Sequence, residues 1–80
     1  MRRQHLDEQT FQYFITIGAT IDEEMIAQKL SVARLARLAG VSRSTVYEVI
    51  NGTFNVRIGT LKQLTDVLGI TIDIKRRTYV

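Results

Sequence analysis

The most constraining feature of this chain is the spacing of small and apolar side chains within residues 31–52. Ala36 and Gly40 are small, and Val46 and Val49 are β-branched residues three positions apart. Residues three apart lie on the same face of a helix, so the two valines point inward together. Ala36 leaves room for a crossing backbone, and Gly40 takes a positive φ at no steric cost. The spacing therefore predicts two short helices joined by a tight turn and packed at a steep angle.

Helix start and stop signals occur at both ends of these two helices, and a further stop signal lies at residue 69. Ser31 and Ser42 stand where N-caps are needed, one before each helix. Gly40, Gly52 and Gly69 each follow an apolar periodic segment, where a left-handed residue is expected to end a helix.

Length and composition exclude several classes of protein. Eighty residues with 45% hydrophobic content bury one small core, too little for an ordinary catalytic pocket, so we expect one domain over residues 1–80. With no Cys and a single, isolated His5, we expect no disulfide, metal site, cofactor or enzymatic activity. The apolar stretch of residues 11–21 is too short to span a bilayer, and no cleavage signal follows it. We therefore expect a cytoplasmic protein.

The segment before residue 28 fits two secondary structures. Apolar residues recur at spacings of three and four, which favours one long helix over about residues 10–28. These residues are Phe11, Phe14, Ile15, Gly18, Ile21, Met25 and Ile26. However, apolar side chains also alternate over residues 11–17, as in a strand. In that alternative the helix begins only at Thr20, where Thr20 and Glu23 would form a capping box. The long helix is the favoured prediction.

A further apolar stripe follows the two short helices. It predicts a helix over about residues 58–68, for which Thr60 and Gln63 would supply a capping box. The stripe consists of Ile58, Leu61, Leu64, Val67 and Leu68.

Beyond Gly69 the period changes from helical to alternating. Ile70, Ile72 and Ile74 alternate with polar residues, which predicts a β-strand over residues 70–79. A lone strand leaves its backbone groups unpaired. We therefore expect it to pair with the same strand of a second copy, forming a homodimer, or with residues 11–17 if these are extended.

Positive charge gathers on the segment of the two short helices. Residues 31–57 carry four Arg and one Glu, a net charge of +3, whereas residues 1–30 carry a net −2. At 100° per residue, the face opposite the inward valines carries polar side chains. These are Ser44, Tyr47, Glu48 and Asn51. A basic segment with a polar outer helix face predicts insertion of the second helix into the major groove of double-stranded DNA.

Four residues at the start of that helix are candidates for DNA contact. Arg43 can reach a base edge ahead of the helix, and Arg is the usual bidentate partner of guanine; a phosphate contact is the alternative. Ser44 can donate to a base or a phosphate, and Thr45 can offer its methyl group to thymine. Tyr47 can bind a phosphate, with partial burial of its ring as the alternative.

Four more residues complete the candidate DNA-binding set. Glu48 can accept a hydrogen bond from cytosine, although pairing with a nearby Arg is favoured. Asn51 is expected to end the helix and can also reach a phosphate. Arg34 and Arg37 lie on the outer side of the first of the two short helices. This position suits contact with phosphate or simple exposure to solvent.

Residues 31–52, with Leu61, Leu64 and residues 68–70 following, resemble the Xre/Cro family of lambda-repressor-like helix-turn-helix regulators. The resemblance implies a mainly α fold, a bundle of four or five helices with residues 42–51 as recognition helix. It also implies DNA contacts at Arg43, Ser44, Thr45 and Tyr47. The sequence departs from the family at Val32, where many members place a phosphate-binding Gln, and at Gly59, where a better helix former is common.

The function expected from these features is sequence-specific regulation of transcription. The favoured form is a repressor that binds a palindromic operator as a homodimer. Residues 70–79 are similar to antitoxins of the high-persistence type, which implies an alternative: an antitoxin that binds its toxin and represses its own operon. A third alternative is a protein-interaction module that does not bind DNA.

Overall fold

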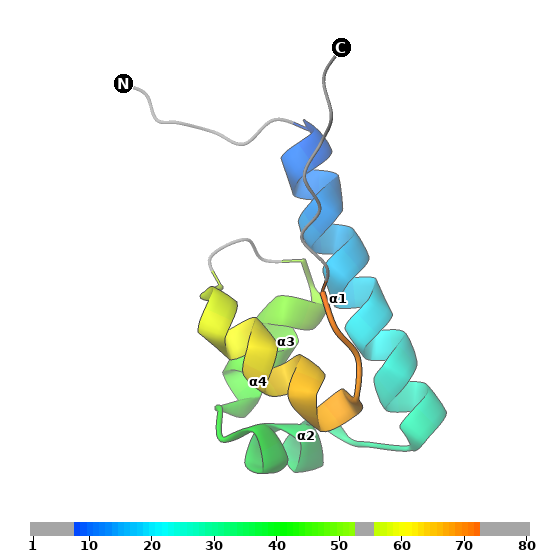
Figure 1. The fold of residues 1–80 in the computed structure, drawn as a ribbon, viewed down its shortest axis with the longest axis vertical. Helices are drawn as coiled ribbons and strands as arrows, with labels where there is room; N and C mark the ends of the chain where they lie inside the picture. Colours follow the sequence, from blue (N-terminus) through cyan, green and yellow to red (C-terminus); the bar gives the residue numbers. More distant parts are fainter. Residues whose placement is uncertain (1–7, 53–55, 73–80) are drawn as a thin grey trace.

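The computed structural model describes residues 8–52 and 56–72. This part of the chain forms four helices: α1 Glu8–Gln28, α2 Val32–Ala39, α3 Arg43–Ile50 and α4 Ile58–Leu68. The three shorter helices gather beside the C-terminal half of α1, and the N-terminal half extends past them (Figure 1). The expected mainly helical fold is therefore confirmed.

The prediction of one long first helix is confirmed, and the alternative of a strand followed by a shorter helix is not. α1 runs without interruption for 21 residues, so a strand over residues 11–17 and a helix start at Thr20 are both wrong. The Thr20 hydroxyl donates to the carbonyl oxygen of Thr16 at 2.9 Å, as a residue inside a helix can. The helical period prevails because Ile17, Gly18 and Ile21 pack towards the core at helical spacing. The alternating residues Phe11, Tyr13 and Ile15 are exposed instead.

Both predicted N-caps of the two short helices are confirmed. The Ser31 hydroxyl accepts a hydrogen bond from the Arg34 backbone N–H, and the Ser42 hydroxyl accepts one from that of Thr45, each at 3.1 Å. Each bond satisfies a backbone donor that the first turn of a helix otherwise leaves unpaired.

The predicted glycine stops are also confirmed, whereas one predicted cap is wrong. Gly40 and Gly69 follow α2 and α4 with φ of 75° and 73°, and Gly52 follows the end of α3 with φ of 80°. α4 begins at Ile58, so Thr60 lies inside the helix and does not cap it.

The core draws apolar side chains from all four helices. Its buried members are Ile21, Met25, Leu35, Ala36, Ala39, Val46, Val49, Leu61, Leu64 and Leu68. Ile26 and Ile58 belong to the predicted apolar stripes but are 70% and 78% exposed, because they lie at the margins of those stripes. The side-chain amide of Gln28 donates to the Leu68 carbonyl oxygen at 2.7 Å, which ties the end of α1 to the end of α4.

The predicted C-terminal strand falls mostly beyond the described residues. No strand is assigned within residues 8–52 and 56–72, and Ile74 lies outside them. In the described beginning of the segment, Ile70 packs against the core and Ile72 is exposed. This segment, orange in Figure 1, runs beside α1. The strand itself stays a prediction.

Candidate nucleic-acid interface

The inner face of α3 anchors this helix in the bundle. Val46 and Val49 are buried, as their three-residue spacing predicted. The opposite face is exposed and carries the polar side chains predicted for it: Ser44, Tyr47, Glu48 and Asn51. Tyr47 is 54% exposed, so it is open to a partner and also partly buried. α3 therefore presents a polar outer surface on a firmly packed helix.

Gly18 of α1 sets how closely α1 approaches the end of α3. A Cβ atom at this position would lie 2.3 Å from the Val49 carbonyl oxygen and 2.7 Å from that of Ile50. Real Cβ atoms do not approach backbone oxygens this closely, so only glycine allows the observed packing. The sequence pattern placed Gly18 in an apolar stripe but did not reveal this role. A glycine within the buried stripe of a long helix is the signal that points to it.

The N-terminal end of α3 is organised by Ser42. Its hydroxyl accepts from the Thr45 backbone N–H and also lies 2.9 Å from the Thr45 hydroxyl. The Thr45 hydroxyl is therefore already engaged within the protein. Arg43 and Ser44, the first two residues of the helix, are exposed. The Arg43 guanidinium has no hydrogen bond or ion pair among the residues that the structure describes.

The remaining predicted site residues are also on the surface. Arg34 and Arg37 on α2 are exposed, and Asn51 ends α3 with its backbone N–H bonded to the Tyr47 carbonyl oxygen at 3.0 Å. The predicted ion pair between Glu48 and a nearby Arg is not found over residues 8–52 and 56–72. The Glu48 carboxylate is thus exposed on the outer face of α3 without a cationic neighbour in that part of the chain.

The two departures from the family pattern have different structural roles. Val32 is half-buried and packs against the core at the start of α2. Gly59 lies in the first turn of α4, and a Cβ atom there would meet nothing within 4 Å. Its lack of a side chain is therefore not required by packing within the described residues.

Two short helices joined by a tight turn, with the second exposing a polar face, define a helix-turn-helix DNA-binding domain. Comparison with known families agrees: residues 20–73 match the Cro/C1-type helix-turn-helix DNA-binding domain. Because this match covers more than half of the 80 residues, the chain belongs to that family. The predicted resemblance to the Xre/Cro regulators is confirmed. A comparison with curated proteins found no match.

The family and the exposed face of α3 are those of a DNA-binding regulator. Within the part of the chain that the structure describes, no helix has both the length and the apolar character needed to cross a membrane.

Proposed function

We propose that this protein is a transcriptional repressor that inserts α3 into the major groove of a palindromic operator. The observation that carries this proposal is the exposed outer face of α3, headed by an Arg43 side chain that has no partner within the described residues. The buried Val46 and Val49 fix α3 against the core, so the outer side chains of α3 are presented to DNA by a firmly packed helix.

Base contacts are assigned to the first turns of α3. Arg43 binds guanine through its O6 and N7 atoms, and Ser44 donates to a neighbouring base or phosphate. Thr45 contributes its methyl group to thymine, because its hydroxyl is bonded to Ser42. Glu48 accepts from cytosine N4, a role that its lack of a cationic neighbour favours.

Phosphate contacts are assigned to the flanks of α3 and to α2. Tyr47 and Asn51 bind the backbone beside the groove, while Arg34 and Arg37 supply sequence-independent attraction to phosphate. The net charge of +3 over residues 31–57 supports this arrangement.

The functional species of this proposal is a cytoplasmic, nucleoid-associated homodimer. A two-fold dimer reads two half-sites about 34 Å apart, or a multiple of that spacing. The alternation of Ile70, Ile72 and Ile74 supports strand pairing between the two copies. The resemblance of residues 70–79 to antitoxins of the high-persistence type favours a second candidate, an antitoxin that also binds a toxin protein. Stable co-purification with the product of an adjacent gene distinguishes this candidate from a stand-alone repressor.

The decisive experiment is selection of bound sequences from random duplex DNA at stated salt concentrations. A repressor enriches a palindromic motif, and binding weakens as salt rises. Arg43→Ala is expected to cost about 1–3 kcal/mol on the selected site and to relax one base position. Equal losses on selected and random DNA would reduce Arg43 to a phosphate contact. Failure of the wild-type protein to bind any duplex would refute the proposed function.

A further inference from the structure

The N-terminal half of α1 lies outside the family domain. α1 begins at Glu8, whereas the family match begins at residue 20. We refer to residues 8–19 as the α1 extension. At 1.5 Å per residue, α1 is about 31 Å long, against about 12 Å for each of α2 and α3. Figure 1 shows the extension, in blue, continuing past the shorter helices. The helix-turn-helix core therefore does not account for its length.

The α1 extension has a largely apolar surface, and Glu8 at its start is its only charged residue. No charged residue occurs between Thr10 and Ile21. Phe11, Tyr13 and Ile15 are nevertheless 44%, 53% and 37% exposed. A solvated helix face ordinarily carries charged side chains, and a helix of this length gains most of its stability from packing. These exposed side chains indicate a surface that another apolar surface covers.

An open cavity of about 430 Å³ lies between the α1 extension, α4 and the segment after α4. Its apolar lining includes Tyr13, Phe14, Ile17, Leu61, Ile70 and Ile72. The Tyr13 and Phe14 rings meet edge to face, with centroids 6.1 Å apart. Tyr13 is thus both an exposed residue of the extension and part of the cavity wall, and the cavity also reaches the beginning of the predicted strand.

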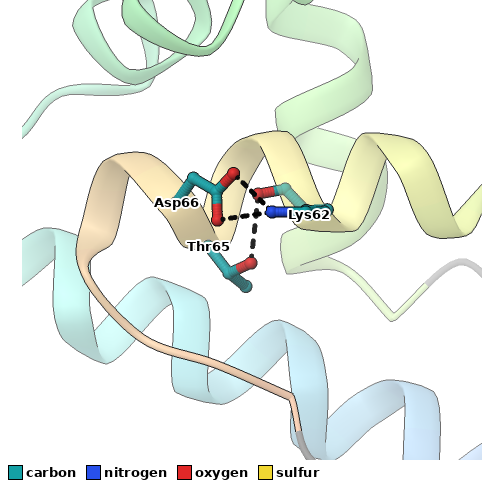
Figure 2. Close-up of polar contacts among 3 residues, drawn as sticks. All are labelled: Lys62, Thr65 and Asp66. Atoms are coloured by element: carbon teal, nitrogen blue, oxygen red, sulfur yellow. Dashed lines mark hydrogen bonds and ion pairs between the residues drawn. The ribbon is translucent and has the colours of Figure 1, made fainter.

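The polar side chains around the cavity carry no net charge. The Lys62 ammonium lies 2.9 Å from the Asp66 carboxylate, so each charge is neutralised by the other (Figure 2). The Thr65 hydroxyl donates to the Lys62 carbonyl oxygen at 3.2 Å. Lys62, Thr65 and Asp66 therefore offer no unpaired charge to a charged ligand. The apolar surfaces of two copies of this chain can meet at the cavity without electrostatic repulsion.

The exposed apolar area fits a dimer of this chain. Five large side chains contribute to it: Phe11, Tyr13, Ile15, Ile58 and Ile72, exposed by 37% to 78%. At roughly 150–250 Å² for each large side chain, their exposed parts amount to about 400–600 Å². This is about half or more of the ~800 Å² that each partner buries in a stable interface.

We propose that the α1 extension of one copy packs against the cavity of a second copy, and that the second copy's extension does the same in return. This inference rests on the proposed function, since it describes how the proposed repressor forms its homodimer. Such pairing is two-fold symmetric and closed, so it does not lead to fibres. Ile70 and Ile72 line the same cavity, so helix and strand contacts would form one interface.

The test compares two lysine substitutions on the same helix. Tyr13→Lys places a charge in the proposed interface, and Ile26→Lys places one at an exposed α1 position that does not line the cavity. We expect the wild type and Ile26→Lys to sediment as dimers at micromolar concentration. Tyr13→Lys is expected to weaken self-association on the order of 100-fold, because symmetry introduces each substitution twice. Circular dichroism of both variants tests whether their helix content equals that of the wild type.

A second variant keeps the test decisive if Tyr13→Lys loses helix content. Ile58→Lys approaches the same cavity from α4, where the side chain is 78% exposed and makes little contact within its own copy. Ile58→Lys is expected to weaken self-association to a similar extent. Equal self-association of the two cavity variants and Ile26→Lys would overturn the proposal, with the strand alone then forming the dimer.

Other occupants of the cavity give different results. If residues 73–80 of the same chain cover it, the wild type sediments as a monomer and a chain ending at Ile72 self-associates. A monomer that carries a small apolar molecule in native mass spectrometry would likewise overturn the proposal.

Binding to DNA separates this inference from the proposed function. Tyr13→Lys is expected to bind an isolated half-site as the wild type does, while losing the additional affinity for the full palindrome. A dimeric wild type that binds no duplex refutes the repressor but leaves the α1 pairing standing. A Tyr13→Lys variant that still binds the palindrome as a dimer refutes the pairing but leaves the repressor standing.

Discussion

Replacing Gly18 by alanine tests whether the close approach of α1 to the end of α3 holds the bundle together. The new Cβ atom would meet two backbone oxygens, those of Val49 and Ile50, at 2.3 and 2.7 Å. Ordinary contacts of a Cβ atom begin at 3.4 Å. The two helices must therefore separate by about 1 Å, since a backbone carbonyl within a helix cannot rotate away as a flexible side chain would.

Two opposing effects determine the change in the free energy of unfolding. Alanine stabilises a helix interior by about 1 kcal/mol relative to glycine. Overpacking costs about 1–3 kcal/mol, and contacts with backbone rather than side chains place Gly18→Ala at the upper end. We expect a net destabilisation of about 2 kcal/mol, which for a domain of this size lowers Tm by about 8–16 °C.

The matched control is Gly59→Ala in the first turn of α4. A Cβ atom there meets nothing within 4 Å, so only the gain in helix propensity remains. We expect this variant to be more stable by about 0.5–1 kcal/mol. Thermal unfolding followed by circular dichroism measures both variants. If Gly18→Ala raises Tm as Gly59→Ala does, the α1–α3 packing described here is refuted.

Three further substitutions address packing, DNA binding and a helix end. Ala36→Leu inserts three carbons at a buried position and should cost about 1–3 kcal/mol in urea unfolding; wild-type stability would contradict the tight α2 packing. Arg37→Ala should weaken binding to all DNA sequences and reduce the salt slope by about one, whereas an unchanged slope would place Arg37 in solvent. Lys29 follows the end of α1 with φ of 58°, so Lys29→Gly should stabilise the fold by about 1 kcal/mol, and an unaltered unfolding midpoint would argue against strain there.

Features that depend on a few neighbouring residues could be predicted from the sequence. Ser31 and Ser42 cap α2 and α3, and Gly40 and Gly69 end α2 and α4, as expected. These assignments succeed because a cap or a left-handed residue acts on backbone groups within four positions of itself. A capping signal failed at the start of α4. This helix begins at Ile58 without a side-chain cap, so the predicted capping box of Thr60 and Gln63 is not used.

The partition of α3 into two faces was predictable for a similar reason. Val46 and Val49 share one face by helix geometry alone, and the polar residues necessarily occupy the other. Whether Arg43 and its neighbours contact bases stays a prediction, since those contacts involve DNA.

Only the tertiary structure decided the roles of residues whose partners are distant in the chain. Residues 11–17 carry both helical and strand periods, and the packing of Ile17 and the adjoining Gly18 against the other helices resolves the choice. Gly18 is a spacer only because the end of α3 lies against it. The cavity likewise joins Tyr13, Leu61 and Ile70 from three separate segments. Hydrogen bonds between near neighbours can be read from local sequence, whereas close packing depends on which surfaces the whole chain brings together.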